Sequence, residues 1–71
     1  MRIVEQRIMD VKGSPVNVLV EDPGDTSNHY FVTYTWRSGK VLNGSLIKGQ
    51  FDNGKRNHLY LRRLALKLLD K

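Results

Sequence analysis

The side chains most able to do chemistry in this 71-residue chain are cations that gather in its second half. Up to Thr35 the chain has three basic and five acidic residues, whereas after Thr35 it has nine basic and two acidic residues. A lobe with this excess attracts polyanions, and nucleic acid is the most common of these. We predict that phosphates are contacted by Arg37, Lys40, Lys48, Lys55, Arg56, Arg62, Arg63 and Lys67. A simpler interpretation is that these basic residues only form the solvent-exposed surface of a helix and two strands and bind nothing.

The segment 48–56, KGQFDNGKR, is a second candidate for phosphate binding. It offers three cations and the backbone donors of Gly49 and Gly54, and it comes just before a predicted helix. Phosphate binds well where cations and free backbone amides precede the N-terminus of a helix. The simpler interpretation is a polar connection with an Asn-Gly turn.

Catalysis has few candidate residues in this sequence. Cysteine is absent, which excludes disulfides, thiolate metal sites and thiol catalysis. The two histidines, His29 and His58, fall in a predicted loop and at a predicted helix start, and no catalytic or metal-binding motif surrounds them. A chain of this length also has little room for a buried pocket. We therefore predict a protein that is not an enzyme and that needs no cofactor or metal.

The apolar segments favour a cytoplasmic location without a membrane partner. The longest one, Leu59 to Leu69, is interrupted by Arg62, Arg63 and Lys67, so it is too short and too charged to span a bilayer. Near the N-terminus, Glu5 and Asp10 stand where a signal peptide would need an apolar run.

Three segments have the composition of strands. Residues 15–21 alternate around three valines, residues 30–37 are rich in aromatic and β-branched side chains, and residues 40–47 follow a tight Ser38-Gly39 turn. Asn43-Gly44 lies inside the last segment and is a bulge or a competing turn. We favour the turn at Ser38-Gly39.

The N-terminal segment is ambiguous. As a helix it would align Val4, Ile8 and Val11, and as a strand it would form a hairpin with residues 15–21 through a short loop at Gly13. We favour the strand, although Ile3 and Val4 are adjacent and break the alternation.

The C-terminal segment, residues 58–71, is predicted to be a helix with Asn57 as its N-cap. One stripe of this helix should face the sheet; it consists of Leu61, Leu64, Ala65 and Leu68. A second stripe lies almost opposite and is formed by Leu59 and Leu66, with Leu69 beside them. This second stripe predicts a protein contact, with a partner helix, a second copy of the chain or an acidic partner. The alternative is that the N-terminal segment covers it.

The aromatic residues of the segment 30–37 share one face of a predicted strand. Tyr30, Tyr34 and Trp36 could stack with bases of single-stranded nucleic acid, or they could form the core beneath the helix. We favour the core, because the chain has few other large residues. In that case Phe31, Thr33, Thr35 and Arg37 lie on the outer face, where such residues suit contact with a duplex.

From Pro15 onward the chain resembles part of a double-stranded-RNA-binding domain. The resemblance covers about two thirds of the chain and is carried by short segments of low specificity: Pro15, Val16, Val18, residues 21–24 (EDPG), 30–32 (YFV) and 39–44 (GKVLNG), and the pair Lys55-Arg56. It implies the order helix, three strands, helix, with Lys55 and Arg56 gripping phosphates. The final segment departs from the family, because LYLRRLALKLL replaces an alanine-rich helix.

These observations predict an α+β fold over residues 1–71, a single small basic domain. We expect a small antiparallel four-stranded meander with a C-terminal helix packed on one face, and the alternative is an α-β-β-β-α order. The predicted function is nucleic-acid binding or regulation, with the basic half on phosphates. A chain this short, basic and free of cysteine is similar in composition to phage-type regulators. The alternative is a modulator of a host machine, such as transcription, that docks on an acidic protein through Leu59, Arg62, Arg63 and Leu66. A homodimer through the same face is compatible with either.

Overall fold

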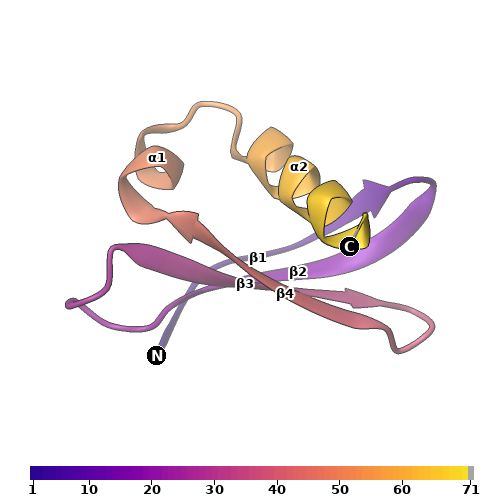
Figure 1. The fold of residues 1–71 in the computed structure, drawn as a ribbon, viewed down its shortest axis with the longest axis horizontal. Coiled ribbons are helices and arrows are strands. Elements are labelled where there is room, and N and C mark those ends of the chain that lie inside the picture. Colours follow the sequence, from indigo (N-terminus) through magenta and orange to yellow (C-terminus); the bar gives the residue numbers. More distant parts are fainter. Residues whose placement is uncertain (71) are drawn as a thin grey trace.

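The computed structural model describes residues 1–70, and it has one antiparallel sheet followed by two helices (Figure 1). The elements are β1 (Arg2–Val11), β2 (Ser14–Asp22), β3 (His29–Trp36), β4 (Val41–Ile47), α1 (Lys48–Asn53) and α2 (Asn57–Leu69). The strands lie in the order β1-β2-β3-β4. The predicted α+β meander with a C-terminal helix is confirmed. The N-terminal segment is a strand, so the α-β-β-β-α alternative is wrong.

The first hairpin is set by its turn residues. Lys12 and Gly13 have positive φ values of 52° and 81°. Two such residues give the turn whose twist matches that of the flanking strands. The imperfect alternation near the N-terminus also has a cause, because the register of β1 against β2 shifts between Ile3 and Glu5. An irregularity of this kind lets adjacent apolar residues occur within a strand.

The second hairpin turns at Ser38-Gly39, as predicted. The Trp36 amide donates to the Lys40 carbonyl at 2.9 Å, and β4 then pairs with β3 in unbroken register through Asn43-Gly44. Gly44 is therefore neither a bulge nor a turn. A Cβ atom there would lie 3.1 Å from a methyl group of Leu64 and 3.2 Å from one of Leu68, so the glycine allows α2 to approach the sheet closely.

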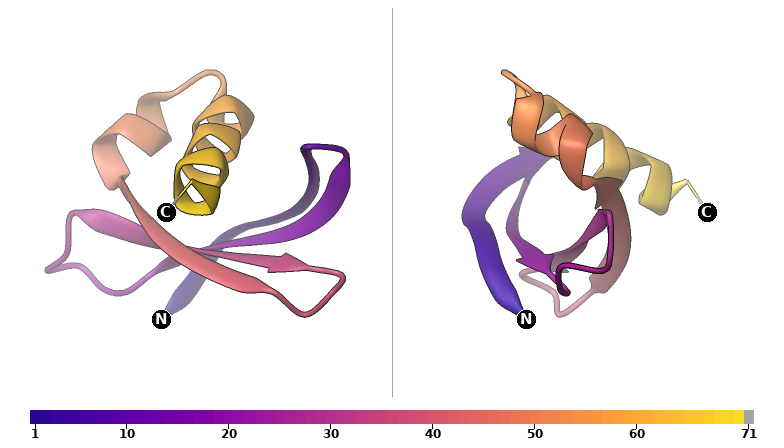
Figure 2. Two further views of the ribbon diagram at one scale, coloured as in Figure 1. Left: turned by 45° about the vertical axis from the view of Figure 1, so that its right-hand side comes forward. Right: turned by 90° about the vertical axis from the view of Figure 1, so that its left-hand side faces the viewer.

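The core lies between the concave face of the curved sheet and the two helices (Figure 2). β2 and β3 direct alternate side chains inward, and α2 buries Leu61 and Ala65 against them. Tyr30 and Tyr34 are buried in this core and Trp36 packs against it. The preferred interpretation of the aromatic face as core is thus confirmed, and the base-stacking platform on β3 is wrong.

One buried polar contact fixes α2 over β3. The Tyr34 hydroxyl donates to the Leu61 carbonyl at 2.6 Å. Burial raises the pKa of Tyr34, so the hydroxyl keeps its proton and remains a donor.

The segment after β4 differs from the prediction. Residues 48–53 form helix α1 rather than a loop, because Phe51 can be buried there, with its ring edge-on to Tyr30 at 5.6 Å between centroids. Helix α2 begins at Asn57, one residue earlier than predicted. No side chain caps it, so the N-cap role predicted for Asn57 is wrong. Among residues 1–70, no helix has the length and apolar character needed to cross a membrane.

Candidate nucleic-acid interface

The whole net charge of the protein lies on α2 and the turn that precedes it. This stretch, from Gly54 to Leu69, has five basic residues and no acidic one, whereas the rest of the chain has seven of each. The five are Lys55, Arg56, Arg62, Arg63 and Lys67. None of them takes part in the three ion pairs formed between residues 1–70. Their charge is therefore available to an anion.

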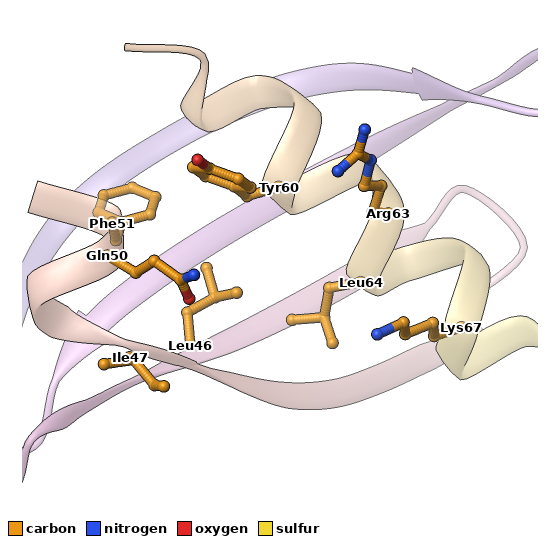
Figure 3. Close-up of a pocket in the computed structure, with 8 residues that line it drawn as sticks. All are labelled: Leu46, Ile47, Gln50, Phe51, Tyr60, Arg63, Leu64 and Lys67. Carbon is orange, nitrogen blue, oxygen red and sulfur yellow. The ribbon is translucent and has the colours of Figure 1, made fainter. Parts of the chain in front are cut away.

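Arg63 and Lys67 stand one helical turn apart beside a groove of about 270 Å³ (Figure 3). The groove runs between α2 on one side and β4 with α1 on the other. Its lining residues are Leu46, Ile47, Gln50, Phe51, Tyr60, Arg63, Leu64 and Lys67. Arg63, Lys67 and Gln50 are exposed at the rim, whereas the side chains of Leu46 and Leu64 are half-buried. The groove thus combines an apolar floor with a basic wall.

The other cations of α2 and its preceding turn have different positions. Lys55 and Arg56 are exposed in the turn between the helices. The Arg62 Nε donates to the Asp10 carbonyl at 3.2 Å, which places Arg62 on the β1 side of α2, away from the groove. The structure therefore separates Arg62 from its neighbour Arg63.

Arg37 and Lys40 lie at the β3–β4 turn, at the end of β4 that is distant from α1. The Lys40 ammonium group is 5.9 Å from the centre of the Trp36 ring. These two predicted phosphate contacts are thus not beside Lys55 and Arg56. They also have different neighbours, because Arg37 lies with Ile8, Asn17 and Thr35 on the outer face of the sheet, whereas Lys40 lies over Trp36.

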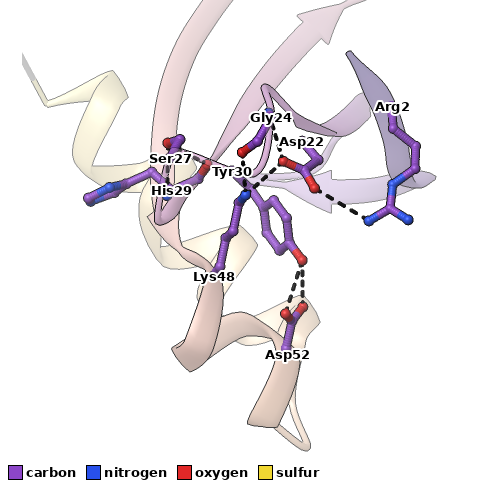
Figure 4. A network of polar contacts seen from close by, with 8 residues as sticks. All are labelled: Arg2, Asp22, Gly24, Ser27, His29, Tyr30, Lys48 and Asp52. Carbon is purple, nitrogen blue, oxygen red and sulfur yellow. Dashed lines mark hydrogen bonds and ion pairs between the residues drawn. The ribbon is translucent and has the colours of Figure 1, made fainter.

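Lys48 belongs to a network of polar contacts that ties α1 to the sheet (Figure 4). Its ammonium group lies 2.8 Å from Asp22 Oδ1 and donates to the Gly24 carbonyl at 2.8 Å. Hydrogen bonds from Lys48 and from the Gly24 amide, together with the charge of Arg2, hold the pKa of Asp22 below its usual value. Because these contacts occupy its ammonium group, Lys48 is not free to bind a phosphate without breaking them.

The same end of the molecule contains a second contact that sequence reasoning missed. The Tyr30 hydroxyl donates to both oxygens of Asp52, at 2.8 and 3.0 Å. This hydrogen bond and burial raise the pKa of Tyr30. No local pattern could reveal this contact, because the two residues are 22 positions apart.

One of the backbone amides predicted to bind phosphate in the segment 48–56 is already hydrogen-bonded within the protein. The Gly54 amide donates to the Phe51 carbonyl at 3.3 Å, so it closes α1 instead of facing an anion. Of the residues predicted in this segment, Gly49, Lys55 and Arg56 are exposed as phosphate binding requires, whereas Lys48 and Gly54 are half-buried.

The second leucine stripe of α2, predicted to be exposed, is largely covered. Leu66 and Leu69 pack against the core and Leu59 is half-buried. The reason is the curvature of the sheet, which brings the β1–β2 hairpin up beside α2 (Figure 2). The alternative of cover by the N-terminal segment fits this arrangement. The interface assigned to Leu59, Leu66 and Leu69 remains a prediction with little free apolar area.

Three of the exposed apolar residues lie together on the outer face of β1 and β3. Ile8 is 71% exposed, Ile3 58% and Phe31 47%. Of these three, only Phe31 is among the residues that the sequence assigned to this face, because the sequence left open whether residues 2–11 form a strand or a helix. No group of three histidine, aspartate or glutamate side chains able to hold a metal ion forms within residues 1–70.

Comparisons with protein-family models, with curated proteins and with solved structures find no match to this chain. The resemblance to a double-stranded-RNA-binding domain gains no support from the fold. The first helix that this family requires is replaced by strand β1, and β1 pairs with β2 along its whole length.

Proposed function

We propose that this protein is a small non-enzymatic nucleic-acid-binding protein with a regulatory role in the cytoplasm. It contacts phosphates through α2 and the turn before it. The observation that carries the proposal is the placement of the entire net charge of +5 on this stretch, without an ion pair among the described residues.

Four of the five cations are suited to this contact. Lys55, Arg56, Arg63 and Lys67 are exposed, whereas Arg62 is half-buried and bonded to the backbone of β1. A protein that neutralises phosphates with such residues releases condensed counterions, so its affinity falls with salt. Four contacts correspond to a slope of log affinity against log salt of about −3.6 on duplex DNA and about −2.8 on a single strand.

The proposal is tested by titrating a fluorescein-labelled oligonucleotide, single-stranded and duplex, at several salt concentrations. The paired variants Lys55→Ala/Arg56→Ala and Arg63→Ala/Lys67→Ala should each weaken binding. Each should also make the slope shallower by about 1.4 on a single strand and about 1.8 on duplex DNA.

The matched control is Arg37→Ala/Lys40→Ala, which removes the same charge at the distant hairpin. It should have a smaller effect on both affinity and slope. An equal effect of all three pairs would show that only bulk charge matters, and absence of binding at low salt would refute the proposal.

The alternative function is docking on an acidic protein through Leu59, Arg62, Arg63 and Leu66. It has less apolar surface to offer, because Leu66 packs against the core. Retention of a protein partner that persists after nuclease treatment, and that is lost in Leu59→Ala, would favour this alternative.

A further inference from the structure

We infer that the groove between α2 and β4 receives an unpaired base of single-stranded nucleic acid, while Arg63 and Lys67 hold the adjoining phosphates. This inference rests on the proposed function and specifies which form of nucleic acid is bound.

The groove has the chemistry that a base attached to a phosphate chain requires. Its floor is formed by aliphatic and aromatic side chains, Leu46, Leu64, Phe51 and Tyr60, which suit the flat apolar faces of a base. Gln50 stands at the opposite rim, where its amide can donate to and accept from a base edge (Figure 3). The basic wall supplies the charge that complements the phosphates.

The turn between the helices fixes the aromatic end of the groove. A Cβ atom on Gly54 would lie 2.7 Å from the Tyr60 ring and 3.0 Å from the Gln50 carbonyl. The absence of a side chain there lets the ring of Tyr60 pack directly against the end of α1. The groove is therefore built by the fold and not by mobile side chains alone.

A single strand fits this site better than a duplex. In a duplex the flat faces of the bases are stacked on one another, and only their edges are accessible. An apolar floor next to phosphate-binding cations can be used only by a base that leaves the stack.

The outer face of the sheet is a poorer platform for bases. Its exposed aromatic residue, Phe31, is paired across the strands with Glu21 and Ser45. A carboxylate next to the ring would repel the phosphates that accompany a stacked base.

The test compares three fluorescein-labelled oligonucleotides of equal length: an oligothymidylate with one central 2-aminopurine, a strand in which every nucleotide is abasic, and a duplex. The intact single strand should bind at least about fivefold more tightly than the abasic strand, since stacking of one base contributes this much. The 2-aminopurine fluorescence should change on binding.

The variant Tyr60→Ala removes an aromatic side chain from the groove without changing the charge. It should remove the preference for the intact strand and leave the salt-dependent phosphate binding in place. Phe31→Ala, on the outer face of the sheet, is the matched control and should leave the preference unchanged. Circular dichroism of both variants shows whether they fold.

The outcomes separate the inference from the proposed function. Equal binding of the intact strand, the abasic strand and the duplex would overturn the inference and leave the proposed function standing. Failure of every oligonucleotide to bind at low salt would overturn both.

Discussion

The two faces of the sheet have opposite properties, although the same strands form both. The inner face is covered by the helices and buries Val16, Val18, Val20 and Val32 almost completely, whereas the outer face leaves Ile8 71% exposed. The charges differ as well. Within the strands the outer face contains two acidic residues, Asp10 and Glu21, and no basic one, while the helical layer on the other side has the whole positive excess.

This difference assigns separate tasks to the two faces. The inner face provides the packing that holds the fold, and the helices on it present the cations to an anion. The outer face contributes little to the stability of the chain, and its strands lack the positive excess of the helical layer. Substitutions at paired inner and outer positions can therefore test the distinction directly.

The largest difference is expected between Leu61→Ala and Ile8→Ala. Leu61 is fully buried in the centre of the core, so its truncation should lower the free energy of unfolding by about 2–5 kcal/mol. The same change at exposed Ile8 should cost less than about 0.5 kcal/mol. Urea denaturation followed by circular dichroism measures both, and similar losses would contradict the assignment of the two faces.

A smaller difference is expected between the neighbours Gly44 and Asn43. Gly44→Val places methyl groups where Leu64 and Leu68 already lie, so it should cost about 1–3 kcal/mol by displacing α2 from β4. Asn43 points outward and is exposed, and Asn43→Ala should be nearly neutral despite losing its contact with Thr33. If Gly44→Val were equally stable, the close approach of α2 would be wrong.

Tyr34→Phe should lower the free energy of unfolding by about 1 kcal/mol, because it removes a buried hydrogen bond to the carbonyl of Leu61. Tyr60→Phe is the matched control, since the hydroxyl of Tyr60 forms no hydrogen bond within residues 1–70. Equal melting temperatures of the two variants would show that the Tyr34 hydroxyl does not fix the helix.

The smallest effect concerns pH and the end of the sheet near α1. The pKa of Asp22 is lowered in the folded protein, so its contribution to stability is present above the ordinary value of 3.8. That contribution is lost as the pH falls through the lowered folded-state pKa. Asp22→Asn should flatten the dependence of the unfolding free energy on pH in this acidic range. Parallel curves of unfolding free energy against pH for the wild type and Asp22→Asn would show that Asp22 does not contribute to the pH dependence.

Much of the fold could be predicted from local patterns. Alternating aromatic and β-branched residues identified β3, and the turns at Gly13 and Gly39 placed two hairpins. Helix α1 could not be predicted, because it is stabilised by packing of Phe51 against Tyr30, two residues that are far apart in the sequence. The same is true of Lys48, whose partner Asp22 is 26 positions away along the chain.

The candidate site was predicted in composition but not in arrangement. The residues of the basic stretch were evident from the sequence, yet their grouping depends on which side of α2 each one takes. Arg62 and Arg63 are adjacent in the chain and face different neighbours, β1 and the groove. The groove itself needs β4, α1 and α2 together, and no motif describes it.

The sign and location of the charge, the alternation of the strands and the turns between them follow from residue type and from neighbours in the chain, so they can be recognised without a structure. Which cations remain free, which leucines are covered and where a groove opens depends on how the elements pack. The physical reason is that burial and ion pairing depend on distance in space, and only the curvature of the sheet beneath α2 brings those residues together.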